Sequence, residues 1–356
     1  MHNIGKREFF TALGMGILHS LFSLFVIASS FWLCLALWIQ EPMGWLISRI
    51  LIGTWIAFAL SILGIYVTEN FFSRRKDVII YILVFILSLF WYFGLEAKQD
   101  REWNPEVAQT LHYERQGDLV TLHNVRHFDW HQDGTSTPHW ENRTIDLNQI
   151  KGVNIITSYW MGPQIAHTLV SFDFKNAKPL TFSIEIRKEK TEDFSAIGGF
   201  FRKFELSLIA SDEKDILYTR SNIRGEQVYF FPINMAKPEM KALFEEYLLK
   251  ADQLNQHAKW YNTLTSNCTT LVFDMVQAVS KKHLPSDYRL LASGYLPNYL
   301  YDLKALNQDW DMETWYQKAH INPRTAQFSH FKYQSSENFS KVIRYGLPES
   351  DPQKAP

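Results

Sequence analysis

The sequence of 356 residues predicts an α+β domain preceded by three transmembrane helices. Long apolar stretches with almost no charge fill the first 97 residues, which carry 11 of the 73 charged side chains. Segments rich in β-branched and aromatic residues follow between about 118 and 235, and helical spacing begins near 237. The average composition, with net charge −1 and 46% hydrophobic residues, therefore combines two unlike parts.

Three apolar stretches predict the membrane domain, residues 1–97. Residues 9–39 and 78–95 carry no charge, and residues 45–67 carry only Arg49, near the start of the stretch. Each is close to the roughly 20 residues that cross a bilayer core. A secretory signal peptide would have a shorter apolar region and would not be followed by two more such stretches.

Positive charges in the short loops predict the orientation. Lys6 and Arg7 precede the first stretch, the segment "SRRKD" (73–77) separates the second from the third, and the turn 40–44 has no Lys or Arg. Because loops rich in Lys and Arg stay in the cytoplasm, the N-terminus is expected there. Three spans then place the part after residue 97 on the periplasmic face of a bacterial inner membrane.

The outer part divides into three predicted segments. Residues 98–117 form a charged linker, residues 118–305 a globular domain, and residues 306–356 an irregular C-terminal extension. Strands are expected at 118–130, 152–160, 165–174, 179–188, 214–223 and 226–233, while 200–210 fits a helix or a strand. Helices are expected at 237–256 and at about 267–282.

Several functional classes lack support in the sequence. No basic stripe is present to neutralise phosphates, which argues against nucleic acid as a partner. The motifs of serine hydrolases, zincins and phosphate-binding loops are also missing, and no cofactor is expected. His123, His127 and His131 share one face, but on a strand they would spread over roughly 13 Å. The sequence therefore predicts no metal site.

Cys268 is the first candidate for chemistry. The chain has two cysteines, and Cys34 lies in a predicted span, so Cys268 has no partner for an intramolecular disulfide. An unpaired cysteine in a periplasmic domain is a candidate reactive thiol.

The surroundings of Cys268 predict a position at the start of a helix. Ser266 or Thr265 is the expected N-cap, and Leu271, Val272, Met275 and Val276 share one apolar face with the cysteine. The positive end of the helix dipole favours the thiolate, which is the nucleophilic form. The alternative is a small buried hydrophobe, because free cysteine is often buried.

His167 is the candidate base. In a hairpin of 165–174 and 179–188 with residue 172 opposite 180, His167 lies opposite Glu185 on the same face. Glu185 would then fix the imidazole for the cysteine, as in nucleophile–base–orienter arrangements. The alternative is that both residues belong to a solvated polar face.

The motifs together resemble a known family. The segments "NVRHFDW", "SYWMGPQIAHTLVSFDF", "FSIEIRKE", "GFFRKFEL", "YTRSNIRGE" and "YNTLTSNCTT" occur in the order seen in the Lnb N-terminal periplasmic domain family. This resemblance covers about 118–300. The same region also resembles the wider group of permuted papain-like, NlpC-type folds. In that group a histidine on a strand precedes a cysteine on a helix, which is the order of His167 and Cys268.

The resemblance implies acyl-enzyme chemistry on a thiol. Cys268, His167 and Glu185 match the catalytic positions, and Asn267, Tyr261 and Arg187 are expected to bind the oxyanion or substrate. Lnb proteins move an acyl chain within a bacterial lipoprotein. In those proteins, however, the periplasmic domain precedes the spans, whereas here three spans come first.

The sequence therefore predicts a thiol-dependent acyltransferase or hydrolase at the membrane. Its expected partners are the bilayer and a bacterial lipoprotein or phospholipid that donates the acyl group. Two alternatives remain: a peptidoglycan amidase or peptidase, and a non-catalytic periplasmic binding or scaffold module.

Overall fold

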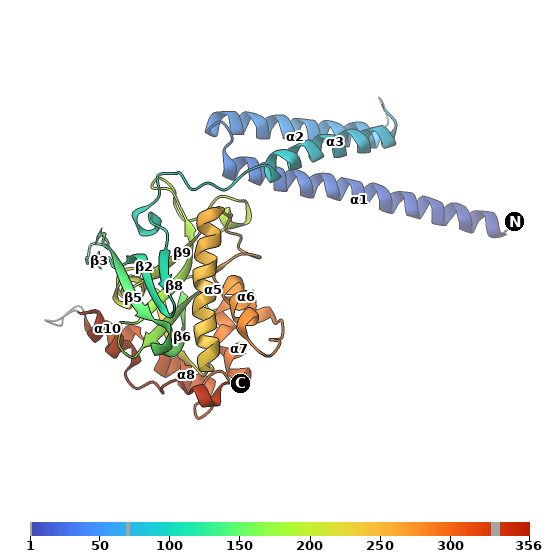
Figure 1. The fold of residues 1–356 in the computed structure, drawn as a ribbon. Coiled ribbons are helices and arrows are strands. Elements are labelled where there is room, and N and C mark those ends of the chain that lie inside the picture. Colours follow the sequence, from blue (N-terminus) through green and yellow to red (C-terminus); the bar gives the residue numbers. More distant parts are fainter. Residues whose placement is uncertain (1, 69–71, 329–334) are drawn as a thin grey trace. The chain divides into compact units, whose positions relative to one another are not determined.

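The computed structural model describes residues 2–68, 72–328 and 335–356, with side chains from residue 14 onward (Figure 1). The chain divides into two compact units. The first contains Met1–Ala97 and Ser195–Lys203, and the second contains Lys98–Phe194 and Phe204–Pro356.

Three helices form the first unit, as the sequence predicts. They are α1 (His2–Gln40), α2 (Trp45–Thr68) and α3 (Arg74–Phe93), and each has a stretch long and apolar enough to cross a membrane. Tyr81 of α3 is fully buried among them, and its hydroxyl lies 2.7 Å from the Ser29 hydroxyl of α1. This polar contact is satisfied inside the helical unit, as the interior of a membrane protein requires.

The segment Ser195–Lys203 belongs to the helical unit through hydrogen bonds. The Gln40 amide donates to the carbonyls of Phe201 and Arg202, at 2.5 and 2.8 Å. The Arg202 guanidinium donates to the carbonyls of Tyr92 and Phe93, at 3.2 and 3.1 Å. The last carbonyls of a helix lack partners within the helix, so Arg202 satisfies the end of α3.

The second unit is built on an eight-stranded sheet. Along the sheet the order is β1-β2-β9-β8-β7-β6-β10, with β5 also paired to β2. The strands are β1 (His112–Gln116), β2 (Leu119–Arg126), β5 (Trp140–Asp146), β6 (Ile150–Tyr159), β7 (Ala166–Phe174), β8 (Leu180–Arg187), β9 (Glu205–Ser211) and β10 (Gln227–Ile233). All these pairings are antiparallel except a short parallel contact between β2 and β9. A separate ribbon pairs β3 (Asp129–Trp130) with β4 (Ser136–Thr137).

Helices bury both faces of the sheet. On one face α5 (Lys237–Gln256) and α6 (Cys268–Val279) pack on apolar side chains of β7 and β8; the rings of Phe182 and Tyr247, for example, stack at 4.5 Å. On the other face α4 (Glu213–Tyr218) and the C-terminal α10 (Ser336–Arg344) enclose a second core that includes Leu169. The polar face predicted for β7 and β8 is therefore buried rather than solvated.

The strand predicted at 214–223 is wrong. Residues 214–223 form α4 and a π-helical turn, Thr219–Ile223, instead of a strand. The Asp212 side chain accepts the Lys214 backbone N–H and begins the helix, an N-cap that outweighs the β-branched composition.

The C-terminal segment is helical rather than irregular. After α7 (Leu296–Asp302) come α8 (Met312–Ala319), α9 (Asn322–Thr325) and α10. Phe339 and Ile343 of α10 are fully buried, so its short apolar face gains stability from the sheet and not from helix length. The predicted linker likewise contains β1 and a 3₁₀ turn, Pro105–Val107.

Gly294 fixes the start of β7. A Cβ atom at this position would lie 2.0 Å from the Pro163 carbonyl oxygen, so no side chain fits. The neighbouring Ser293 hydroxyl accepts the Ala166 N–H at 2.9 Å and donates to the Ala166 carbonyl at 2.7 Å. This close approach positions the backbone immediately before His167.

Candidate functional site

The predicted hairpin register is confirmed. Phe172 of β7 pairs with Leu180 of β8, and Leu169 pairs with Ser183. Continuing this register places His167 beside Glu185.

The His167 imidazole is held by two side chains of β8. Its Nε2 lies 2.7 Å from the Ser183 hydroxyl and 3.3 Å from Glu185 Oε1. The Ser183 hydroxyl in turn donates to the same carboxylate oxygen at 2.6 Å. Because Nε2 is engaged on this side, Nδ1 is the ring nitrogen left to face another group.

Arg220 was not predicted as part of the site. It extends from the π-helical turn and donates to Glu185 Oε1 at 2.7 Å and to Glu226 Oε2 at 3.1 Å. Burial opposes ionisation of Glu185, but His167 and Arg220 hold the pKa of its carboxyl well below the usual range. Glu185 is therefore a carboxylate, and its charge is compensated on both sides.

Cys268 lies in the first turn of α6, as predicted, and is its first residue, but the N-cap is Asn267 rather than Ser266 or Thr265. The side-chain oxygen of Asn267, Oδ1, accepts the N–H groups of Thr269 and Thr270 at 2.8 and 2.9 Å. The amide group of Asn267 donates to the Thr263 carbonyl at 2.6 Å. These bonds use the side-chain oxygen and one of the two amide hydrogens, so the role of Asn267 in binding an oxyanion stays a prediction.

The thiol of Cys268 lies against His167. Burial raises the pKa of the thiol. The charge and hydrogen bond of His167 lower it by more, with help from the Thr168 backbone N–H and the Thr269 hydroxyl, so the net pKa of the thiol lies below its usual value. Burial lowers the pKa of His167, while Glu185 raises it, with a net value of about 9. Both shifts favour a thiolate–imidazolium pair.

Two contacts surround the start of α6, and the first of them joins it to β7. The hydroxyls of Thr168 on β7 and Thr269 on α6 lie 2.9 Å apart in the buried interface. The Tyr261 side chain, one of the predicted substrate-binding groups, interacts with the backbone of Cys268, and burial raises the pKa of its phenol. Tyr261 therefore lies next to the residue that carries the thiol, and its role in binding a substrate stays a prediction.

Arg187 is the predicted site residue that the structure places elsewhere. Its guanidinium donates to the carbonyls of Val107 and Ala108 at 3.1 and 3.0 Å, and it lies 4.4 Å from the centre of the Trp103 ring. The side chain is 5% exposed, and burial lowers its pKa to about 10. Arg187 therefore anchors the segment before β1 and is not available to a substrate.

Asp173, the other acid on this strand face, has separate partners. Its carboxylate accepts from Arg344 of α10 at 2.6 Å and from Asn154 at 3.0 Å. Burial raises the pKa of Asp173, and Arg344 opposes this effect. Asp173 therefore joins α10 to the sheet, and Glu185 is the acid beside His167.

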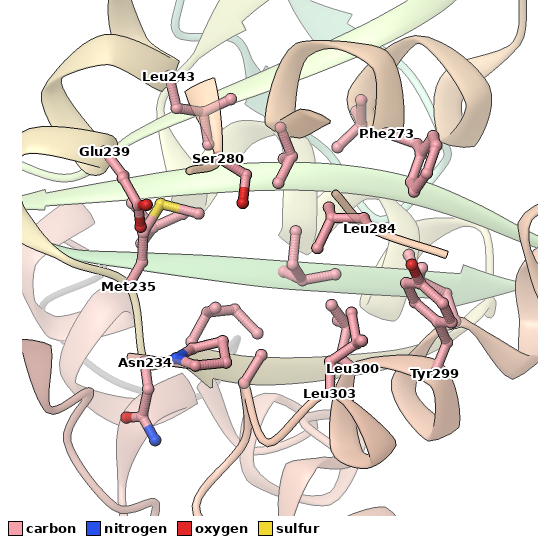
Figure 2. Close-up of a pocket in the computed structure, with 18 of the residues that line it drawn as sticks. Asn234, Met235, Glu239, Leu243, Phe273, Ser280, Leu284, Tyr299, Leu300 and Leu303 are labelled. Atoms are coloured by element: carbon pink, nitrogen blue, oxygen red, sulfur yellow. The ribbon is translucent and has the colours of Figure 1, made fainter. Parts of the chain in front are cut away.

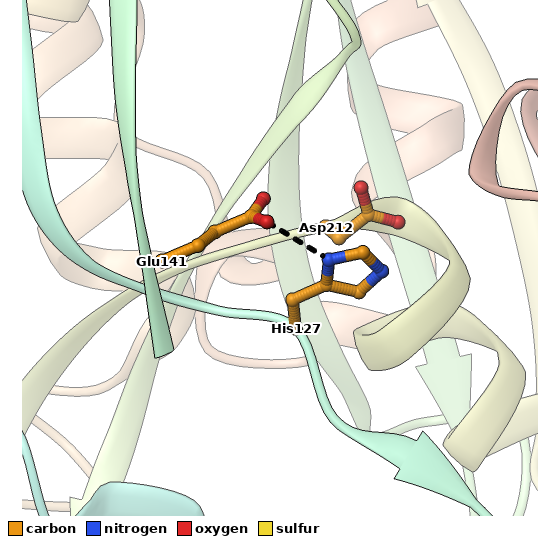
Figure 3. Close-up of side chains that lie close together, drawn as sticks. All are labelled: His127, Glu141 and Asp212. Atoms are coloured by element: carbon orange, nitrogen blue, oxygen red, sulfur yellow. Dashed lines mark hydrogen bonds and ion pairs between the residues drawn. The ribbon is translucent and has the colours of Figure 1, made fainter. Parts of the chain in front are cut away.

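A second polar cluster consists of His127, Glu141 and Asp212 (Figure 3). Their ligand atoms lie within 4.8 Å of one another, and His127 Nδ1 is 3.1 Å from Glu141. Arg143, however, donates to both Glu141 and Asp212 at 2.5 Å. The guanidinium thus occupies the position in which a cation would balance the two carboxylates. His123 and His131 have different partners, Glu114 and Thr137.

The sequence contains partial signals for the residues that were missed. Arg220 lies in the segment "YTRSNIRGE", which contributes to the family resemblance, but spacing alone does not direct its side chain to Glu185. Ser183 lies two residues before Glu185 on β8, so the period of two puts it on the same face, but its bonds to both Glu185 and His167 depend on the side-chain rotamer.

Comparison with known proteins agrees with the motifs. Residues 136–294 match the model of the family described as the Lnb N-terminal periplasmic domain, a range that contains His167, Glu185, Arg220 and Cys268. Neither the curated proteins nor the solved structures provide a match to the chain. The resemblance predicted from the sequence is thus confirmed for residues 136–294, which match the Lnb N-terminal periplasmic domain model, and three helices that can cross a membrane precede this range in the chain.

Proposed function

We propose that this protein is a membrane-anchored periplasmic thiol enzyme that transfers or hydrolyses acyl groups of lipoproteins or phospholipids. The observation that carries the proposal is the position of Cys268 in the first turn of α6 against His167, whose Nε2 faces Ser183 and Glu185. This arrangement has the nucleophile, base and orienter of a thiol acyl-transfer enzyme. The domain is accordingly assigned to the permuted papain-like group, with the histidine strand before the cysteine helix.

In the first half of the proposed reaction, the Cys268 thiolate attacks the carbonyl carbon of an ester or amide. The carbonyl π electrons move to oxygen, and a tetrahedral oxyanion forms. When the oxyanion collapses, the bond to the alcohol or amine breaks, and the His167 imidazolium gives its proton to this leaving group. The acyl group remains on Cys268 as a thioester.

In the second half, an amine or water attacks the thioester carbonyl. Neutral His167 takes the proton of the attacking group, and the thiolate leaves, which regenerates the ion pair. An amine acceptor gives an N-acyl product, and water gives a free acid. Glu185 stabilises the imidazolium in each half-reaction because it remains ionised beside Nε2.

Two groups are proposed to stabilise the oxyanion. The backbone N–H of Cys268 lies at the start of α6, where N–H groups and the helix dipole favour negative charge. The Tyr261 oxygen accepts this same N–H, so a substrate oxygen that binds there would displace it and would then meet the Tyr261 hydroxyl as a second donor. The Asn267 side chain, predicted from sequence, remains a third candidate for this role.

The acyl-transfer function is tested in cells. In a strain that lacks the gene, mass spectrometry of lipoprotein N-terminal peptides and of phospholipids should show an altered distribution of acyl chains. The wild-type gene should restore the distribution, whereas Cys268→Ala, which removes only the sulfur, should not. Soluble muropeptides turned over without lipid would instead identify a peptidoglycan amidase, and full restoration by Cys268→Ala would identify a scaffold.

The lowered pKa of Cys268 predicts a reactive thiol. In the full chain carrying Cys34→Ala, iodoacetamide should label Cys268 faster than free cysteine at pH 7, because more of the thiol is ionised. His167→Ala removes the charge that lowers this pKa, so the labelling profile should shift to higher pH, with about tenfold less thiolate at pH 7 per unit of pKa. His131→Ala, at an exposed histidine, is the control and should leave the profile unchanged. A thiol that stays inert from pH 6 to 10 would indicate a buried hydrophobe.

The position of Glu185 predicts a positioning role that is separate from folding. Glu185→Gln should lower kcat/KM by on the order of 10²-fold or more, because the imidazolium loses its charged partner. The pKa of His167, followed by NMR, should fall from about 9 toward its ordinary value. Asp173→Asn is the matched control, since its partner is Arg344, and should retain the turnover of whatever fraction stays folded. Normal turnover in Glu185→Gln with a loss in Asp173→Asn would show that the orienting acid is Asp173.

The proposed topology is tested with reporter fusions. A reporter that is active only in the periplasm should be active when fused after residue 100 and inactive when fused after Lys76, in the Arg-rich loop. The opposite result would place the thiol domain in the cytoplasm and exclude a periplasmic acyl donor.

A further inference from the structure

An apolar cavity lies beside the thiol helix in the second unit (Figure 2). Its space for the centres of water-sized molecules is about 100 Å³, well above the roughly 10–15 Å³ that one water needs. Branched aliphatic and aromatic side chains from β6, β10, α5, α6 and α7 dominate its walls; Val153, Ile155, Leu243, Val272, Leu296 and Leu300 are examples.

The cavity follows one face of α6 from the thiol end to the far end. The helix contributes Thr269, Val272, Phe273, Val276 and Val279 to the lining, and the next residue, Ser280, continues it. These residues recur every three to four positions and so form a single stripe. From Thr269 to Ser280 the helix rises by roughly 16 Å. The stripe begins at the residue directly after Cys268, with the Thr269 hydroxyl 3.9 Å from the Cys268 sulfur.

Most polar groups on the walls already have partners. The Tyr299 hydroxyl donates to the Pro285 carbonyl at 2.9 Å, and the Asn234 carbonyl oxygen accepts the Asp351 N–H at 2.8 Å. Glu239 and Ser280 lie near each other at one end of the cavity, and Phe273 and Tyr299 lie at the other end (Figure 2). The middle of the cavity therefore offers an occupant mainly apolar contacts, which suit a hydrocarbon and disfavour a peptide or a sugar.

We infer that this cavity is the subsite for the hydrocarbon tail of the acyl group that Cys268 transfers. The inference rests on the proposed function and identifies the part of the substrate that the enzyme selects. An extended chain advances about 1.3 Å per carbon when its C–C bonds are about 1.5 Å long, so roughly 16 Å holds about 12 carbons. A tail in the cavity would supply the contacts that an empty apolar space lacks.

The test measures chain-length selectivity of the full protein in phospholipid nanodiscs. The probes are p-nitrophenyl acetate, octanoate and dodecanoate, with release of p-nitrophenolate and the intact mass of the thioester as readouts. In the wild type the acylation rate should rise by up to about fourfold per buried methylene. Val276→Phe, which narrows the cavity about two thirds of the way from Thr269 to Ser280, should lower the dodecanoate-to-acetate rate ratio at least tenfold and leave the acetate rate unchanged. All variants are measured in the same nanodiscs. Partitioning of the esters into lipid therefore cancels when the dodecanoate-to-acetate ratio of a variant is compared with that of the wild type.

Two further variants keep the test decisive. Ala278→Phe adds the same ring on the exposed side of α6 and should keep the wild-type ratio. Leu300→Phe narrows the cavity from the opposite wall and replaces Val276→Phe if the melting temperature shows that the latter does not fold. A wild-type ratio in a folded Val276→Phe or Leu300→Phe variant, or a wild type without chain-length selectivity, would overturn the subsite.

A separate measurement distinguishes failure of the subsite from failure of the chemistry. Acylation of Cys268 at equal rates by all three esters would contradict the subsite and retain the thiol mechanism. No acylation of Cys268 by any ester would contradict the proposed function. In that case, photo-crosslinking of a diazirine-bearing dodecanoic acid to Cys268→Ala protein decides the subsite alone: crosslinks in 269–280 and 296–303 support it, and their absence overturns it.

Discussion

The rest of the site depends on one constraint: the buried, ionised carboxylate of Glu185 must have its charge compensated. A buried carboxylate is stable only when charged or polar partners replace its lost hydration. Three side chains from different elements provide those partners: Ser183 of β8, His167 of β7 and Arg220 of the π-helical turn. The requirement to compensate one charge therefore fixes the imidazole, and through the imidazole it sets the protonation of Cys268.

Helices on both faces of the sheet explain why this charge is buried. An antiparallel sheet commonly leaves one face in water, and a histidine there would titrate near its ordinary pKa. Here α4 and α10 cover the face that carries His167, while α5 and α6 cover the other. The thiol reaches the imidazole because α6 begins at the strand end that bears His167, where Thr168 and Thr269 join the two elements. The same face of α6 that packs on the sheet also lines the apolar cavity.

Much of this arrangement could be predicted from local patterns in the sequence. The β7–β8 register follows from the period of two along each strand and the short turn between them, so the pairing of His167 with Glu185 could be predicted from the sequence. The start of α6 was predicted to within one residue, because apolar spacing and a cluster of capping residues coincide there. Three apolar stretches of sufficient length, two without charge and one with only Arg49, predicted the three apolar helices.

Predictions failed where long-range contacts override local preference. The β-branched composition of 214–223 suggested a strand, whereas the cap at Asp212 and burial of Leu217 stabilise a helix. Arg187 shares the predicted polar face of Glu185, but carbonyls of a distant segment bind its guanidinium. The choice of Asn267 as the cap depends on its bond to Thr263, which cannot be inferred from the order of capping residues alone.

The π-helical turn at Thr219–Ile223 makes the length of this segment as important as its composition. The Arg224 N–H donates to the Thr219 carbonyl five residues earlier, at 2.8 Å, so the turn holds one residue more than an α-helical turn. That extra residue sets the direction in which Arg220 leaves the backbone toward Glu185 and Glu226. Loss of a single residue here would restore ordinary helical geometry and rotate the following positions by about 100°. Insertions and deletions, which a comparison of residue types does not score, are therefore the changes to which this side of the site is most sensitive.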